Sequence, residues 1–161
     1  MAIDMFLKFD SIKGESKDAQ HAGEIDVLAW SWGLSNSTTT QTGGGAGAGK
    51  VNIQDLTYTS YIDASLLPLL TAASTGRKIK TAVLTVRRVG TTAKGPDYLT
   101  ITLADILVTS ASTGGSGGED RLTVNVTLNF ADVTINYAPI PGPGTPPSQT
   151  PYHWNIPANQ S

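Results

Sequence analysis

The chain has 161 residues and a mass of 16.8 kDa, which suits one domain able to bury about 70% of its unfolded surface. It contains no cysteine, so disulfides, thiolate zinc sites and cysteine nucleophiles are excluded. The net charge of −2 provides no basic field for nucleic acid or an acidic membrane, and no apolar run approaches the ~20 residues of a membrane helix.

Charged residues make up 15% of the chain, against about 25% in an average soluble domain. Threonine, serine, asparagine and 17 glycines occupy polar positions instead. Two interpretations stay open. Part of the outer surface is covered by other copies of the chain, or the surface is simply rich in threonine and serine, as in many extracellular β-proteins.

The N-terminus lacks the basic segment and following apolar stretch of a secretory signal peptide. We therefore expect the chain to fold in the cytoplasm and to leave the cell only through other machinery.

The first half of the chain predicts strands and one helix. Alternating apolar and polar residues predict strands over residues 2–9, 24–36, 51–60 and 79–89. A helix is expected over residues 63–74, with Asp63 or Ser65 as its N-cap, Pro68 in its first turn and a stop at Gly76. Its apolar stripe is wide enough to close one side of a barrel and contains Leu66, Leu67, Leu69, Leu70 and Ala73.

Two later strands change phase part-way along. Over residues 122–130 the even positions are apolar, and over residues 131–137 the odd positions are apolar, which predicts a bulge or bend near Ala131 and Asp132. Residues 98–108 show the same change past Asp105. Such strands predict a sheet that curls into a barrel or a tightly bent sandwich.

The loops carry glycine and proline. Residues 42–49 and 114–118 are glycine-rich, and residues 90–97 have the chemistry of a hairpin loop. Seven of the nine prolines lie from Pro139 onward. We expect a barrel domain over residues 1–138, an extended linker over 139–151 and a C-terminal segment, 152–161, that docks on the barrel as a short strand.

Two glycine motifs resemble catalytic loops. Residues 44–50 fit a phosphate-binding loop, but Val51 replaces the hydroxyl that magnesium needs, and a strand-like run follows where a helix is required. Ser116 fits a nucleophile elbow, but a β-pattern follows it, and only His21 or His153 could act as its base. Flexible loops explain both motifs better.

Two clusters of charged residues have plain explanations. Asp18, His21 and Glu24 would share a face and bind metal on a helix, but the glycines and β-branched residues around them predict a solvated turn that leads into a strand. A second cluster, Glu119, Asp120 and Arg121, could hold catalytic carboxylates. We favour an exposed turn or ion pairs between subunits.

Trp30 and Trp32 lie two apart on a predicted strand and therefore share a face with Leu28 and Leu34. A sugar-binding platform is one interpretation, and the flanking leucines favour a buried core instead. The opposite face consists of small, neutral residues that suit a close subunit contact or the wall of a pore: Ala29, Ser31, Gly33 and Ser35.

The sequence resembles the Hcp (haemolysin-coregulated protein) family of bacterial type VI secretion systems over almost its whole length. The matching segments are residues 1–12 (MAIDMFLKFDSI), 13–16 (KGES), 24–33 (EIDVLAWSWG), 47–51 (GAGKV), 61–63 (YID), 110–130 (containing STGGSGGEDRLTVNVTLNF) and 154–156 (WNI). The proline-rich residues 139–151 match less well.

The resemblance implies a mainly β, bent two-sheet barrel with one flanking helix, related to phage tail tubes. It implies hexameric rings that stack into a hollow tube, carry small effectors in the lumen and are expelled by a contractile sheath with a baseplate and VgrG spike. No catalysis, cofactor, nucleic acid or membrane insertion is expected.

Together with the small residues opposite Trp30 and Trp32 and with the loops, the resemblance suggests which residues line the lumen and which lie between stacked rings. The lumen face is expected to carry Ala29, Ser31, Gly33 and Ser35. Contacts between stacked rings are expected at Gly44, Gly47, Gly90 and Pro157. The competing interpretations are a carbohydrate-binding β-sandwich that uses Trp30 and Trp32, and a serine hydrolase that uses Ser116.

Overall fold

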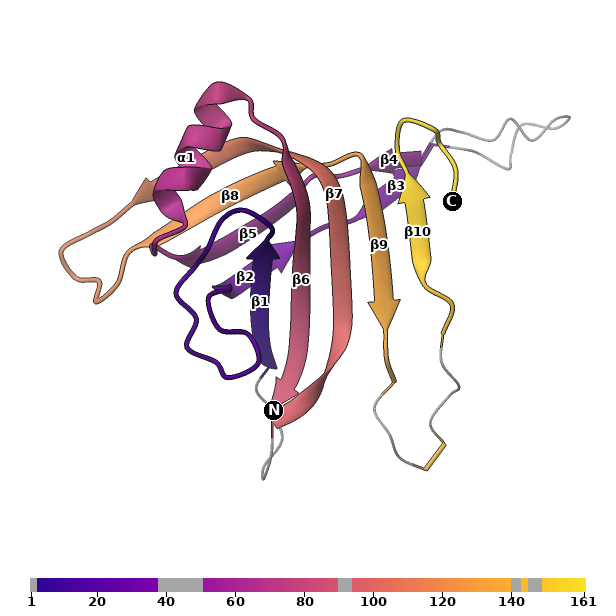
Figure 1. The fold of residues 1–161 in the computed structure, drawn as a ribbon, viewed down its shortest axis with the longest axis horizontal. Helices are drawn as coiled ribbons and strands as arrows, with labels where there is room; N and C mark the ends of the chain where they lie inside the picture. The colour runs from indigo at the N-terminus through magenta and orange to yellow at the C-terminus, as the bar shows by residue number, and fades with distance from the viewer. Residues whose placement is uncertain (1–2, 38–50, 90–93, 140–142, 145–148) are drawn as a thin grey trace, which may run out of the picture.

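The computed structural model describes residues 3–37, 51–89, 94–139, 143–144 and 149–161. It contains a curved eight-stranded sheet, a small two-stranded sheet and one helix (Figure 1). The strands and helix are β1 (Ile3–Phe9), β2 (Ile25–Ser31), β3 (Leu34–Asn36), β4 (Val51–Ile53), β5 (Leu56–Tyr61), α1 (Leu66–Thr75), β6 (Ile79–Val89), β7 (Lys94–Gly114), β8 (Thr123–Asn129), β9 (Asp132–Tyr137) and β10 (Tyr152–Asn155).

Six of the strands close into a barrel. They are ordered β7-β6-β1-β2-β5-β8, and β8 pairs back onto β7. Strand β7 makes closure possible because its first half pairs with β6 and β9 while its second half pairs with β8. Strands β9 and β10 extend the sheet beyond β7, and β10 runs antiparallel to β9. The predicted bent barrel with a flanking helix is therefore confirmed.

The predicted phase changes mark where the chain crosses between the two halves of the barrel. At Asp105 the backbone has φ of 54°, and β7 turns there from β6 toward β8. Residues 122–137 form two strands, since β8 ends at Asn129 and β9 begins at Asp132. Leu122 precedes β8 and is 45% exposed, so its predicted place on the buried face is wrong.

The core fills the barrel with aliphatic and aromatic side chains from every barrel strand. Helix α1 covers one side of it and buries Leu69 and Ala72, while Leu67 is 71% exposed. The helix starts three residues later than predicted, after Ser65, whose backbone N–H donates to Asp63 Oδ1. It ends at Gly76, where φ is 68°, a left-handed conformation that favours glycine.

The predicted strand over residues 24–36 divides in two. A register shift in β2 between Val27 and Ala29 turns Leu28 outward, and it is 42% exposed. Leu34 lies in the ribbon of β3 and β4 and is 45% exposed. The prediction that both leucines belong to the core is therefore wrong, whereas Trp30 and Trp32 are partly buried and pack against the core.

Candidate functional site

The outer face of four strands, β2, β5, β8 and the second half of β7, carries small hydroxyl and amide side chains. Directly paired residues share a face of a sheet, so the strand registers define two rows across it. One row is Ser31, Thr57, Thr127 and Ser110, and the other is Ala29, Thr59, Asn125 and Ser112. We call these eight residues the hydroxyl face.

The hydroxyl face satisfies part of its own hydrogen-bonding capacity. The Thr59 Oγ1 hydroxyl donates to Asn125 Oδ1 at 2.5 Å, and the hydroxyls of Thr57 and Thr127 lie 3.3 Å apart. Neither row contains an ionisable side chain. The face is therefore wettable but holds no fixed charge, and its short side chains offer few strong contacts to a passing molecule.

Charged groups appear where the hydroxyl face ends. At one end Asn129 donates through Nδ2 to Asp55 Oδ1 at 2.9 Å. At the other end the Arg121 guanidinium lies 3.9 Å from the centroid of the Tyr61 ring, a cation–π contact. Glu119 and Asp120 are exposed beside Arg121, and the described part of the chain provides none of the three with an ion pair.

The structure brings together two of the four predicted lumen residues. Ala29 and Ser31 lie on the hydroxyl face, whereas Gly33 follows β2 and Ser35 lies on β3 in the separate ribbon. The other six residues were missed because the sequence analysis located Ser31 by alternation within one strand. The same alternation in β5 and β8, which leaves threonine and asparagine opposite buried Tyr58 and Val126, is the signal that would have found four of them.

Among the predicted stacking residues, Pro157 is exposed and lines a cavity of about 430 Å³ at the end of the barrel where β7 bends. Gly44, Gly47 and Gly90 lie outside the described residues.

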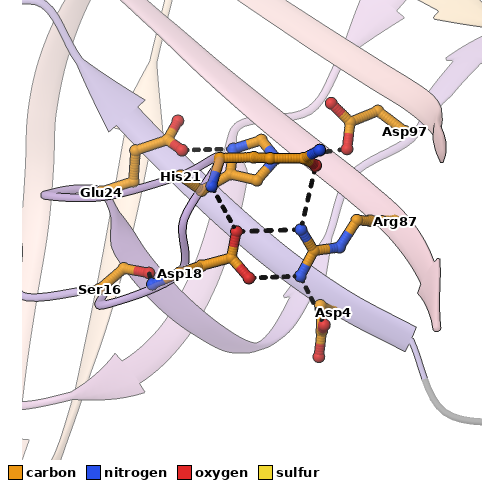
Figure 2. A network of polar contacts seen from close by, with 8 residues as sticks. Asp4, Ser16, Asp18, His21, Glu24, Arg87 and Asp97 are labelled. Carbon is orange, nitrogen blue, oxygen red and sulfur yellow. Dashed lines mark hydrogen bonds and ion pairs between the residues drawn. The ribbon is translucent and has the colours of Figure 1, made fainter. Parts of the chain in front are cut away.

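A second polar site lies on the opposite half of the barrel, on β1 and β6, and its centre is buried. Residues 13–24 cover the outer side of β1 and β6, and Asp18 in this segment accepts two hydrogen bonds from Arg87, at 3.0 and 2.7 Å (Figure 2). Arg87 is 2% exposed and also donates to Asp4 Oδ2 at 2.9 Å. Its pKa is raised above the ordinary value, chiefly by the hydrogen bond to Asp18 and then by that to Asp4.

His21 completes this network, which we call the Arg87 cluster: Asp4, Phe6, Asp18, His21, Glu24, Arg87 and Asp97. The His21 ring stacks on Phe6, with 4.3 Å between the ring centroids. The Nδ1 and Nε2 atoms of His21 face Glu24 and Asp97 (Figure 2). His21 is 8% and Glu24 9% exposed, so the prediction of solvated loop residues is wrong. A short turn buries them because the backbone of residues 14–16 pairs with that of residues 23 and 24.

The Arg87 cluster does not form a metal site. Among the described residues, no group of three or more histidine, aspartate and glutamate side chains could hold a metal ion. Every polar side-chain atom of Asp18 and His21 faces a partner within the fold, so the cluster attaches the covering segment to the barrel.

The described geometry does not support the hydrolase, phosphate-binding or sugar-binding interpretations. Ser116 lies in the exposed hairpin between β7 and β8, and a strand follows it where a nucleophile elbow requires a helix. Strand β4 likewise begins at Val51, directly after the glycine motif. Trp30 and Trp32 pack against the core and do not form an exposed sugar platform.

Comparison with known proteins decides the family. Residues 6–137 match the family described as "Type VI secretion system effector, Hcp". The chain is also 58% identical over 160 residues to "Protein hcp1" of Pseudomonas aeruginosa, covering 99% of this chain and 98% of the relative. This chain belongs to the Hcp family.

Solved structures agree with the assignment to the Hcp family. A structure described as Hcp1 from Salmonella typhimurium is 34% identical, with a TM-score of 0.80 and 99% coverage of both chains. A structure described as a type six secretion system protein is 27% identical, with a TM-score of 0.89 and 99% coverage of both chains. As an Hcp protein the chain is a secreted tube protein of the type VI secretion system, which implies self-assembly.

The family assignment does not favour the carbohydrate-binding alternative. Within the described ranges, α1 is too short to cross a membrane.

Proposed function

We propose that six copies of the chain form a ring whose hydroxyl faces point inward, and that these rings stack into a hollow tube. The tube carries small effector proteins in its lumen and leaves the cytoplasm under the force of a contractile sheath, from a baseplate and behind a VgrG spike. The chain acts as a tube and carrier and not as an enzyme.

The observation that carries this proposal is the composition of the hydroxyl face. A monomeric domain normally keeps its outer surface soluble with lysine and glutamate, yet two rows across four strands have no charge. A tube wall needs such a surface, since fixed charges would retain some cargoes and repel others. The low overall charge of the chain has the same explanation.

Further parts of the proposal concern contacts between copies. Stacking is assigned to Pro157 at one end of the barrel, together with Gly44, Gly47 and Gly90. The exposed Glu119, Asp120 and Arg121 are assigned to ion pairs between subunits. Head-to-tail stacking is open-ended, so the tube can grow, whereas a ring closes by rotational symmetry.

Negative-stain imaging of the purified protein tests the ring. We expect six-fold rings with an open centre, and compact single copies at high concentration would contradict the proposal.

Ser31→Arg tests the direction of the hydroxyl face. The variant should keep the rings and lose bound effector, because a long charged side chain enters the lumen from each copy. Ser11→Arg is the matched control, since Ser11 is exposed and lies outside the hydroxyl face. If rings and effector binding both survive in Ser31→Arg, the lumen face is misassigned.

A further inference from the structure

The outer side of helix α1 is apolar and carries no charge. None of its ten residues is ionisable, and Leu67 in its first turn is 71% exposed. Its exposed hydroxyls are hydrogen-bonded to the backbone of the helix itself. They donate to the carbonyls four residues earlier, at 3.1 Å for Thr71, 2.8 Å for Ser74 and 2.8 Å for Thr75. The helix therefore presents mainly methyl and methylene groups to its surroundings.

A groove that is lined in part by apolar side chains lies between β1 and β2. The two strands pair only at Phe6 with Asp26 and at Leu7 with Ile25. Beyond these pairs β1 follows β6 and β2 follows β5, so the strands diverge. The opening has a volume of about 340 Å³, and its walls include Ile3, Met5, Val27 and Leu28, with Asp4 and Asp26 beside them.

The groove can accept an apolar side chain because two of the apolar residues that line it are exposed to solvent. Ile3 is 46% and Leu28 is 42% exposed, and they belong to the few large apolar side chains that the described chain leaves exposed. The barrel has another corner, where β7 leaves β6 and turns to β8, and there α1 packs against β7 (Figure 1). At the β1–β2 corner no described helix lies over the opening.

We propose that Leu67 of one copy inserts into the β1–β2 groove of a second copy. The helix cannot fill the groove of its own chain, because α1 and the start of β1 lie at opposite ends of the barrel (Figure 1). Two different patches of one chain that fit each other make a heterologous contact, which repeats from copy to copy. This inference rests on the proposed assembly and identifies a pair of surfaces within it.

Charge supports the same pairing. Arg77 and Lys78 come after Gly76 at the C-terminal end of α1 and are exposed, and neither has an ion pair among the described residues. Asp26 beside the groove is also exposed. Asp4 is paired with Arg87, so Asp26 is the carboxylate that the groove offers to a second copy. These charges favour a contact in which the C-terminal end of α1, followed by Arg77 and Lys78, lies on the Asp26 side of the groove, and they disfavour the reverse orientation.

The absence of natural cysteine allows a direct test by crosslinking. We expect Leu67→Cys with Leu28→Cys in one chain to give, under oxidation, a ladder of multimers on a non-reducing gel that reductant collapses. A mixture of the two single variants should stop at dimers. The matched control combines Leu67→Cys with Leu34→Cys, since Leu34 is 45% exposed and lies on the β3–β4 ribbon.

Assembly of the same variants is followed by light scattering. Rings without a ladder from the Leu67–Leu28 pair, or a ladder equally strong from the Leu67–Leu34 pair, would overturn the inference and leave the proposed function intact. A wild-type protein that stays single at every concentration would overturn both.

Leu67→Asp gives a test without cysteine. We expect it to raise the concentration at which half of the chains assemble at least tenfold, with an unchanged circular dichroism spectrum. Leu34→Asp should leave that concentration unchanged, and equal effects of the two variants would contradict the inference.

Discussion

The Arg87 cluster and the hydroxyl face lie on opposite halves of one barrel, and they use polar groups in opposite ways. In the cluster, the ionic side chains of Arg87, His21 and Glu24 are buried, and Arg87 and His21 each face two carboxylates. On the hydroxyl face the polar groups are neutral, short and open to the surroundings. Charge is concentrated where it holds the protomer together and is absent where we place the lumen.

The comparison predicts where a substitution will affect folding and where it will affect only function. Residues of the Arg87 cluster should be sensitive in the free energy of unfolding. Residues of the hydroxyl face should tolerate change in the protomer and respond only in assemblies or in cargo binding.

The largest expected effect comes from Asp18→Ala. It removes the main partner of a buried guanidinium, and breaking a buried ion pair costs about 3 kcal/mol. Urea unfolding of the protomer measures the loss. The matched control, Asp10→Ala, changes an exposed aspartate and should stay within about 0.5 kcal/mol of the wild type. Equal losses would show that Arg87 does not depend on Asp18.

Gly14→Ala should be the next most damaging change. A Cβ atom at this position would lie 2.5 Å from the backbone oxygen of Glu24, so the covering segment would have to move away from β2. We expect a loss of about 2 kcal/mol in the free energy of unfolding. Gly117→Ala is the control, because nothing lies within 4 Å of its Cβ position. Unchanged stability in Gly14→Ala would mean that the segment is not tightly held.

Alkaline pH should weaken the barrel through Tyr58. Burial raises the pKa of this phenol above its ordinary value of 10.0, and the charge of Asp63 adds to the shift. The unfolded chain therefore loses this proton first as the pH rises, so stability is full below pH 10 and falls above it. For one group the slope is about 1.4 kcal/mol per pH unit.

Tyr58→Phe should reduce this alkaline loss without a large cost at neutral pH, because the buried Tyr58 hydroxyl has no hydrogen-bond partner in the described structure. Burial also raises the pKa of Tyr152, so part of the slope should persist. Free energies of unfolding between pH 9 and 11 test this, and an unchanged slope in the variant would contradict it.

The smallest expected effect on stability belongs to Thr127 at the centre of the hydroxyl face. Thr127→Val removes one long, partly buried hydroxyl contact with Thr57 and should change the free energy of unfolding by less than about 0.5 kcal/mol. Thr127→Lys should unfold similarly but reduce effector binding by the rings. A large loss of stability in either variant would break the contrast with the Arg87 cluster.

Local sequence patterns predicted much of the fold. Strand β6 has the predicted bounds, the phase change past Asp105 marks the bend of β7, and Gly76 ends the helix. These features depend on neighbours in sequence: alternation, a change of phase and a residue that accepts a left-handed conformation.

Contacts between distant segments could not be predicted in the same way. Asp18 and Arg87 are 69 residues apart, and the local pattern around Asp18 is equally typical of a solvated turn. The outward position of Leu28 depends on a register shift against β5, which one strand alone does not reveal. The hydroxyl face was only partly predicted because its rows exist only after four strands are in register.

Distances between spin labels show whether the hydroxyl face lines the lumen. Labels are placed at Ser31→Cys and, in a separate sample, at Lys17→Cys, because Lys17 is exposed on the segment that covers β1 and β6. In assembled rings we expect shorter distances between copies for residue 31 than for residue 17. The reverse order would place the hydroxyl face on the outside of the ring and contradict the proposed lumen.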